Sequence, residues 1–141
     1  MLRALVAEDD HGMRSLLTRA LRRAGFEVEA YASGDAALEA LRRRNTDVLL
    51  TDYLLPGVTG GRLGLEARRQ GLPAVLVSAT LDALSDQERA CFLRVLAKPF
   101  PLAALDEALG ALETAARRKR SGVRPATAGV PATRKRSSGE G

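Results

Sequence analysis

The stretch LRALVAEDD (residues 2–10) joins a short apolar run to three consecutive acidic residues. A compact apolar run of about four to eight residues is typical of a strand that is buried on both faces of a sheet. Similar runs occur at 47–51 (DVLLT), 74–77 (AVLV) and 93–97 (LRVLA), and residues 26–31 (FEVEAY) alternate in the manner of a further strand. The sequence therefore predicts five short strands.

Helical stretches separate these strands. Apolar residues recur at three- and four-residue steps in the first, second and last of them, while the third is a weaker helix and the fourth has a poor apolar stripe. The expected helices occupy residues 11–25, 33–44, 61–70, 82–91 and 102–117. Strands that alternate with helices favour parallel pairing through right-handed crossovers, with helices on both faces of the sheet. We therefore predict an α/β fold, a doubly wound, five-stranded parallel sheet of the flavodoxin-like (βα)5 type with strand order 2-1-3-4-5.

Basic residues are concentrated near the end of the chain. The whole sequence carries 22 Lys and Arg against 17 Asp and Glu. Two of the basic clusters are 117–120 (RRKR) and 134–136 (RKR), and the segment around them has no apolar residue larger than Val. Such a segment cannot bury enough surface to offset its ordering entropy, so we expect a folded domain over 1–116 and a disordered tail over 117–141. Weak nonspecific contact of this tail with nucleic-acid phosphates is one hypothesis for its role.

Length and cysteine content exclude several classes of protein. A chain of 141 residues supports one domain of ordinary size, which excludes a two-domain enzyme. Cys91 is the single cysteine, so an internal disulfide is impossible and a reducing cytoplasm fits. The sequence has no apolar run near the roughly 18 residues of a membrane span, and its first apolar stretch is too short for a signal peptide. We therefore expect a cytoplasmic protein.

Polar residues come directly after the predicted strands, at their carboxyl ends. In such sheets, ligands bind beyond these ends, at the point where the strand order reverses. The first and third strands flank that point, so Glu8, Asp9 and Asp52 should converge, while Ser78 and Lys98 approach from neighbouring strands. Clustered carboxylates repel one another unless a proton or a cation intervenes, and oxygen ligands favour Mg²⁺. This combination suits the stabilisation of a phosphoryl group in transfer.

Four motifs in this order resemble the receiver domain of bacterial two-component response regulators. They are 6–10 (VAEDD), 49–52 (LLTD) with 55–57 (LPG) and Gly60, 77–79 (VSA), and 97–100 (AKPF). Each motif is weak alone, but all four lie at predicted strand ends in the right order. The resemblance covers residues 1–116.

The resemblance implies a phosphoacceptor and a metal site. Asp52 would accept a phosphoryl group from the phosphohistidine of a sensor histidine kinase or a phosphotransfer protein. Asp9, Asp52 and the backbone carbonyl of Leu54 would bind Mg²⁺, and Glu8 would act directly or through water. Such a protein is a switch with an unknown downstream partner protein, and is not a turnover enzyme.

The resemblance also implies how the switch works. Lys98 would pair with the carboxylate and then with the phosphoryl oxygens, and the Lys98–Pro99 bond would be cis. Ser78 would turn inward to hydrogen-bond the phosphoryl group. The change would reach the face formed by the fourth helix, fifth strand and fifth helix, through which a homodimer could also form.

Three features depart from the family pattern. Val95 stands where the family usually has an aromatic residue, so the usual aromatic readout is in doubt. The segments from Asp52 to Ser78 and from Ser78 to Lys98 are short, which suggests trimmed or reshaped third and fourth helices. Leu54 offers no polar side chain to position an attacking water, which favours slow dephosphorylation.

Other interpretations stay open from the sequence alone. Residues 8–10 could be a plain acidic cap of the following helix. A Mg²⁺-dependent phosphohydrolase that forms an aspartyl-phosphate would normally have a second acid at the position of Leu54. A scaffold that works without phosphate is disfavoured by the intact set of Asp52, Ser78 and Lys98. A regulator that contacts nucleic acid through its basic tail is a further alternative. We expect a stand-alone response regulator.

Overall fold

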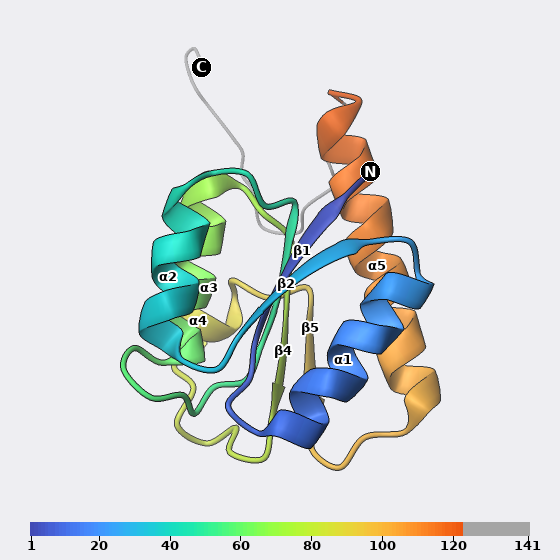
Figure 1. Cartoon of the computed structure of the whole chain (residues 1–141). Helices are drawn as coiled ribbons and strands as arrows, with labels where there is room; N and C mark the ends of the chain where they lie inside the picture. The colour runs from blue at the N-terminus through green and yellow to red at the C-terminus, as the bar shows by residue number, and fades with distance from the viewer. Residues whose placement is uncertain (123–141) are drawn as a thin grey trace.

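All five strands pair in parallel, in the order β2-β1-β3-β4-β5 (Figure 1). The computed structural model describes residues 1–122. Its strands are β1 (Arg3–Ala7), β2 (Glu27–Tyr31), β3 (Val48–Thr51), β4 (Ala74–Ser78) and β5 (Arg94–Ala97). The predicted fold class and strand order are therefore confirmed.

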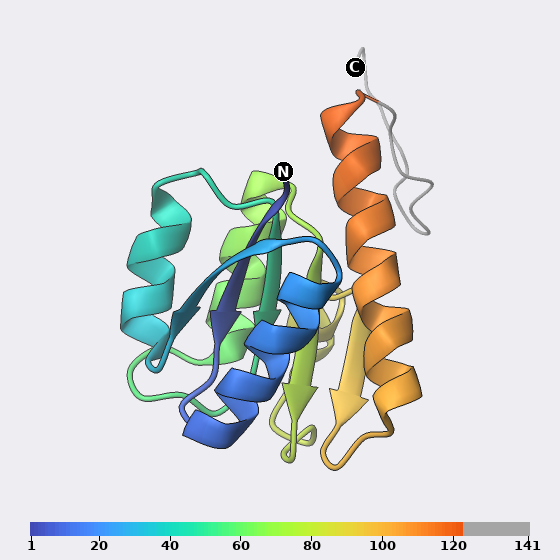
Figure 2. The ribbon, with the colours of Figure 1, turned by 45° about the vertical axis from the view of Figure 1, so that its right-hand side comes forward.

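Helices cover both faces of the sheet (Figure 2). One face carries α1 (His11–Arg23) and α5 (Leu102–Arg120), and the other carries α2 (Gly34–Arg42), α3 (Gly60–Gln70) and α4 (Asp86–Arg89). Successive side chains of a strand point to opposite faces. In β1, Ala4 and Val6 join the core under α1 and α5, while Leu5 and Ala7 join the core under α2 and α3. This two-sided burial explains why the central strands are uniformly apolar.

Side-chain caps begin four of the helices. The side chains of Asp10, Ser33, Thr59 and Ser85 accept hydrogen bonds from backbone N–H groups in the first turns of α1, α2, α3 and α4. Gly71 ends α3 in the left-handed conformation, with φ 74, where a side chain would be strained. None of the helices in residues 1–122 combines the length and the apolar character that crossing a bilayer requires.

The fourth helix is much shorter than the predicted 82–91. It is a single turn, Asp86–Arg89, which Ser85 and Glu88 cap reciprocally in a capping box. The chain then tightens, since the N–H of Phe92 bonds to the carbonyl of Arg89, and pairing with β4 resumes when the N–H of Leu93 bonds to the carbonyl of Ala74. The shortening suggested by the sequence therefore falls on α4, because α3 keeps 11 residues.

The last helix is longer than predicted. Residues 117–120 belong to α5, so the expected domain boundary after residue 116 lies inside a helix, and a disordered tail from residue 117 is wrong for these four residues. Tertiary contacts explain the extension, because Lys119 Nζ donates to the carbonyl of Gln70 at 2.9 Å and Arg120 Nη2 lies 3.0 Å from Asp47 Oδ2. Basic side chains also suit a helix C-terminus. The rest of the predicted tail, 123–141, lies outside the described residues.

Candidate functional site

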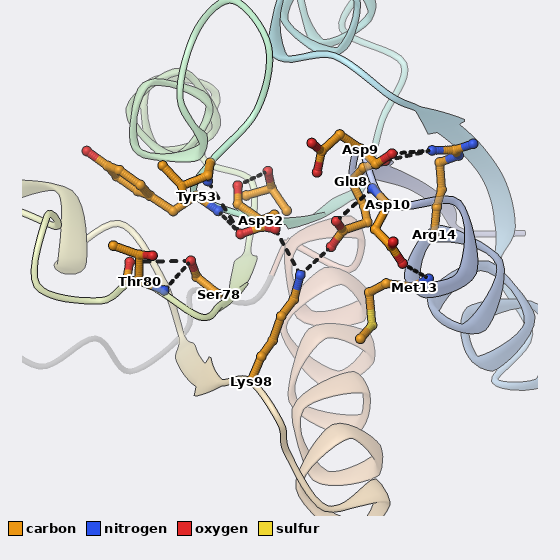
Figure 3. Close-up of polar contacts among 12 residues, drawn as sticks. Glu8, Asp9, Asp10, Met13, Arg14, Asp52, Tyr53, Ser78, Thr80 and Lys98 are labelled. Atoms are coloured by element: carbon orange, nitrogen blue, oxygen red, sulfur yellow. Dashed lines mark hydrogen bonds and ion pairs between the residues drawn. The ribbon is translucent and has the colours of Figure 1, made fainter.

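Acidic side chains from β1 and β3 meet where these strands end. The register pairs Ala7 with Thr51, so the next residues, Glu8 and Asp52, are neighbours across the sheet. Carboxylate oxygens of Glu8, Asp9 and Asp52 lie within 4.8 Å of one another, as Figure 3 illustrates. The structure thus brings together the three acids that the strand order predicts will converge.

Lys98 lies between two of these acids. Its Nζ atom is 2.8 Å from Glu8 Oε1 and 2.8 Å from Asp52 Oδ2 (Figure 3). The lysine comes directly after β5, where its N–H bonds to the carbonyl of Ser78, and the Lys98–Pro99 peptide is cis. The expected pairing of Lys98 with Asp52 is present, and Glu8 is a second partner that the sequence did not indicate.

Burial and charge act against each other at this cluster. Glu8 is fully buried, and this burial raises the pKa of its carboxyl even though Lys98 and the Asp10 N–H stabilise the charged form. Burial also disfavours the Lys98 cation, but hydrogen bonds to Asp52 and Glu8 more than offset it, so the pKa of Lys98 is raised. Lys98 pairs with Glu8 and Asp52 but not with Asp9, so the three carboxylates carry more negative charge than the one ammonium offsets.

This donor set fits a hard divalent cation. The three side chains offer oxygen atoms alone, the ligand type that Mg²⁺ prefers, and Mg²⁺ typically keeps several waters beside one or two carboxylates. Asp9 is exposed, whereas Glu8 and Asp52 are buried, so the cluster opens to solvent on one side. Glu8, Asp9 and Asp52 could therefore hold Mg²⁺. The carbonyl of Leu54 stays a predicted ligand.

Backbone groups fix the carboxylate of Asp52. Its Oδ1 atom accepts from the N–H of Tyr53 at 2.6 Å and from the N–H of Leu54 at 3.4 Å, while Oδ2 faces Lys98. The loop after β3 packs closely on the strand end, since a Cβ atom at Gly60 would collide with the carbonyl of Asp52. Sequence reasoning assigned Gly60 to a loop motif, but it did not identify this close approach.

Ser78 is buried at the end of β4. Its Oγ atom accepts from the N–H of Thr80 at 3.1 Å and donates to the carbonyl of Thr80 at 3.3 Å (Figure 3). The hydroxyl is therefore engaged with the following loop. Among the described residues, it makes no hydrogen bond to Asp52 or Lys98 in this structure.

The acidic run at 8–10 serves two purposes. Asp10 caps α1, since its Oδ2 atom accepts from the N–H of Met13 at 2.8 Å, and Glu8 and Asp9 belong to the carboxylate cluster. Arg14, which sequence reasoning missed, donates from Nη1 to the carbonyls of Glu8 and Asp9 at 2.9 and 3.3 Å. A basic residue one helical turn after an acidic run is a signal that could have identified it. Asp10 therefore acts as the helix cap, while the role of Glu8 and Asp9 as ligands stays a prediction.

Fold and site together define a doubly wound α/β domain with a carboxylate–lysine cluster at the topological switch point. Residues 4–110 match the response regulator receiver domain. The response regulator receiver protein CpdR of Brucella abortus is 35% identical over 112 residues, which cover 72% of this chain and 88% of CpdR. The DNA-binding transcriptional regulator NtrC of Klebsiella pneumoniae is 34% identical over 117 residues, 79% of this chain but 24% of NtrC.

Solved structures agree with these sequence matches. The response regulator TrrA of Thermotoga maritima in complex with Mg²⁺-BeF aligns with a TM-score of 0.70 at 27% identity, over 79% of this chain and 99% of TrrA. A CheY-like receiver domain from Methylobacillus flagellatus aligns with a TM-score of 0.68 at 27% identity, over 79% of this chain and 98% of that chain. The chain belongs to the response regulator receiver domain family.

Proposed function

We propose that the chain is a stand-alone response regulator of a phosphorelay. Asp52 accepts a phosphoryl group from the phosphohistidine of a sensor histidine kinase or a phosphotransfer protein, with Mg²⁺ as cofactor. The protein then signals through phosphorylation-dependent contacts with a downstream protein. The observation that carries this proposal is the pair of hydrogen bonds, each 2.8 Å long, from Lys98 Nζ to Glu8 and Asp52 at the buried side of the acidic cluster.

The proposed transfer is a displacement at phosphorus. A carboxylate oxygen of Asp52 forms the new P–O bond while the P–N bond of the phosphohistidine breaks, and the imidazole nitrogen keeps the electron pair. Glu8, Asp9, Asp52 and the carbonyl of Leu54 would hold Mg²⁺, which when bound supplies positive charge beside the phosphoryl oxygens. Lys98 supplies the other positive charge, and the amides of Tyr53 and Leu54 keep the carboxylate in place.

The proposed switch rests on new charge. A phosphoryl group adds close to two negative charges at neutral pH. Lys98 would exchange the carboxylate of Asp52 for the phosphoryl oxygens. Ser78 would exchange the carbonyl of Thr80, a partner at 3.3 Å, for a charged acceptor, because hydrogen bonds to ionised groups are stronger. This exchange releases the loop after β4. Val95 on β5 stands where the family usually has the aromatic residue that responds to phosphorylation. We therefore propose that the loop after β4 carries the signal in this chain.

Two relatives guide the finer parts of this proposal. The chain spans 88% of CpdR, which supports a stand-alone regulator, whereas it spans 24% of NtrC, so the DNA-binding function in the name of NtrC is not carried over. Homodimerisation through the face of α4, β5 and α5, and a cytoplasmic location, remain parts of the proposal. Because α4 is a single turn, it contributes only Asp86–Arg89 to that face.

A phosphohydrolase is the weaker alternative. That chemistry normally uses a second acid two residues after the nucleophile, and Leu54 occupies this position with an exposed, apolar side chain. A switch that holds its phosphoryl group therefore accounts for the site better than an enzyme that turns over phosphate esters. Slow loss of the phosphoryl group is part of this proposal.

Incubation with acetyl phosphate and Mg²⁺, followed by intact mass measurement, tests the proposal. We expect one phosphoryl adduct on the wild type and on Asp106→Asn, a control that changes an exposed acid of α5, and none on Asp52→Asn. Omission of Mg²⁺ should remove the adduct as well. An adduct of equal yield on Asp52→Asn would exclude Asp52 as the acceptor, and multiple turnover of acetyl phosphate would favour the phosphohydrolase.

A further inference from the structure

Arginines gather at the edge of the sheet opposite the acidic cluster. Each helix runs back against the strands, so the C-terminal ends of α2, α3 and α5 lie together at the edge where the strands begin (Figure 1). We call the following five exposed residues at these ends the basic rim: Arg42, Arg44, Arg68, Arg118 and Lys119. None of the five makes an ion pair with another residue in 1–122.

Hydrogen bonds between the helix ends hold the basic rim together. Lys119 Nζ donates to the carbonyl of Gln70 at 2.9 Å, which joins the end of α5 to the end of α3. The side chain of Gln70 donates to the carbonyl of Leu41 at 2.9 Å, which joins α3 to the end of α2. These bonds therefore join the three helix ends that carry the rim residues.

Three acids near these helix ends form ion pairs with arginines outside the rim. Asp47 pairs with Arg120 at 3.0 Å, Glu66 with Arg69 at 2.8 Å, and Glu113 with Arg117 at 3.0 Å. The five rim cations are additional to these pairs, so they are surplus positive charge. Surplus charge of one sign at one edge of a domain attracts a polyanion.

The helix dipole explains only part of this pattern. A basic residue in the last turn stabilises a helix, which accounts for Arg42, Arg68 and Arg118 one at a time. Arg44 lies beyond the end of α2 and has φ 59, a left-handed conformation in which Gly or Asn would be less strained. The arginine at this position adds positive charge at the expense of local stability.

The side chains of the rim favour phosphates of a nucleic acid over a membrane. Four of the five are arginines, whose planar guanidinium groups bind phosphate oxygens in pairs. Interfacial membrane binding also needs apolar anchors. Among residues 1–122 the exposed large apolar side chains are Met1, Leu54, Leu93 and Leu102. Met1 and Leu93 lie at the edge where the strands begin, since Arg120 donates to the carbonyl of Met1 and the N–H of Leu93 bonds to the carbonyl of Ala74 at the start of β4. This edge therefore has two exposed apolar side chains beside the five cations of the rim.

We propose that the basic rim binds the phosphate backbone of duplex nucleic acid without reading its sequence. Aromatic side chains, on which the bases of a single strand would stack, are absent from the rim, which favours a duplex. The rim lies at the opposite edge of the sheet from the acidic cluster. Binding there leaves the phosphoacceptor site open, and this interaction does not depend on the function proposed for that site.

Fluorescence anisotropy with a labelled 30-base-pair DNA duplex tests this proposal on the full chain. The rim variant is Arg42→Gln/Arg68→Gln/Arg118→Gln, and the matched control is Arg19→Gln/Arg62→Gln/Arg89→Gln, which removes the same charge from exposed arginines elsewhere. We expect the rim variant to bind at least about tenfold more weakly at 50 mM salt, and its salt slope to fall by up to about 2.7, at about 0.9 for each phosphate that is no longer neutralised. The control should stay within about twofold of the wild type.

Three results would overturn the proposal. Equal weakening in both variants would assign binding to net charge alone. An unchanged rim variant, together with loss of binding in Arg134→Gln/Lys135→Gln/Arg136→Gln, would assign it to the segment after residue 122. Tighter binding to vesicles with anionic phospholipid than to the duplex would indicate a membrane surface. Unchanged phosphoryl uptake from acetyl phosphate and an unchanged far-UV CD melt would show that the rim variant is folded.

A single substitution gives an independent test. Arg44→Asn removes one rim charge and relieves the left-handed strain at this position. We expect the midpoint of thermal unfolding to rise while affinity for the duplex falls about threefold, roughly the share of one neutralised phosphate. A rise in stability with unchanged affinity would contradict a role for Arg44 in the rim.

Discussion

Two glutamates are buried at opposite edges of the sheet, and their environments differ. Glu66 on α3 forms an ion pair with Arg69, whose Nη2 atom lies 2.8 Å from Glu66 Oε2. The side-chain amide of Gln70 donates to the same oxygen at 2.7 Å. These partners lower the pKa of Glu66 despite burial. Glu8 shares a single ammonium with Asp52, and burial raises its pKa.

The difference separates a structural carboxylate from a functional one. Glu66 is satisfied by neighbours on its own helix, and Gln70 in turn bonds to the carbonyl of Leu41, so this network ties α3 to α2. Glu8 lies in a cluster whose negative charge exceeds the charge of Lys98. Such an imbalance is costly in the folded state unless a further cation binds. The shortage of positive charge around Glu8, compared with Glu66, therefore distinguishes the ligand site from a structural ion pair.

Removal of the shared cation should have the largest effect. Lys98→Met leaves the buried carboxylates of Glu8 and Asp52 facing each other, so we expect a loss of about 3 kcal/mol in the free energy of unfolding without Mg²⁺. Saturating Mg²⁺ should restore part of the loss. Arg69→Met, the matched change at Glu66, should cost less because Arg69 is exposed, and Mg²⁺ should not alter its effect. Urea unfolding with and without Mg²⁺ measures both. If Mg²⁺ changed the stability of both variants equally, Glu8 and Glu66 would not differ in their need for a further cation.

Neutralising the two glutamates should change stability in opposite directions. Glu66→Gln loses charge-assisted hydrogen bonds and should destabilise the fold by about 1.5 kcal/mol. Glu8→Gln removes a buried charge, so without Mg²⁺ it should be neutral or stabilising by up to about 1 kcal/mol, while Mg²⁺ affinity falls about tenfold. Urea unfolding and a Mg²⁺ titration followed by amide chemical shifts measure these effects. Destabilisation of the same size in both variants would show that the two carboxylates are equally structural.

The pH dependence of stability should differ in sign at the two positions. The pKa of Glu66 in the folded state lies below its ordinary value of 4.5, so its contribution is present above pH 4.5 and is lost as the pH falls through the folded pKa. The pKa of Glu8 lies above 4.5 when folded, so its charged form lowers stability as the pH rises through this window. Unfolding of each Gln variant against the wild type between about pH 2 and 7, without Mg²⁺, tests the two signs. Parallel curves would contradict them.

The smallest effect is expected at Tyr53, beside the acidic cluster. Its N–H holds Asp52, and its hydroxyl donates to the carbonyl of Ala83 at 3.3 Å, in the loop after β4. Tyr53→Phe should lower the free energy of unfolding by about 0.5 kcal/mol, since the bond is long and partly exposed. Amide shifts of residues 80–85 on addition of a beryllofluoride phosphate mimic should also decrease. Unchanged shifts would exclude this hydroxyl from the route between the site and the loop.

Sequence reasoning could predict the site because parallel topology brings the carboxyl ends of the strands to one edge of the sheet. The order 2-1-3-4-5 places the ends of β1 and β3 side by side, so Glu8, Asp9 and Asp52 had to be neighbours once the strands were identified. Side-chain geometry was not predictable in the same way. Lys98 bonds to two carboxylates, and Arg14 donates to two backbone carbonyls. Both arrangements depend on side-chain rotamers that tertiary packing selects.

The errors fell where tertiary contacts override local pattern. Residues 117–120 have the composition of a tail, yet Lys119 and Arg120 bond to Gln70 and Asp47, which are distant in sequence, and the helix continues. Residues 82–91 have a weak helical pattern without an apolar stripe, and the ring of Phe92 instead packs against Gly64 of α3, where a Cβ atom would collide with it. Local propensity decides little at such positions.

A crystal structure of the full chain grown with Mg²⁺ and beryllofluoride would test the carboxylate site most directly. We expect one metal ion bound by Asp9, Asp52 and the carbonyl of Leu54, with Glu8 in direct or water-mediated contact. Lys98 should then lie on the fluorides, and Ser78 should be turned away from Thr80. An ion bound elsewhere, or carboxylates of Glu8, Asp9 and Asp52 that point apart when the ion is present, would contradict the assignment of this cluster as the phosphoacceptor site.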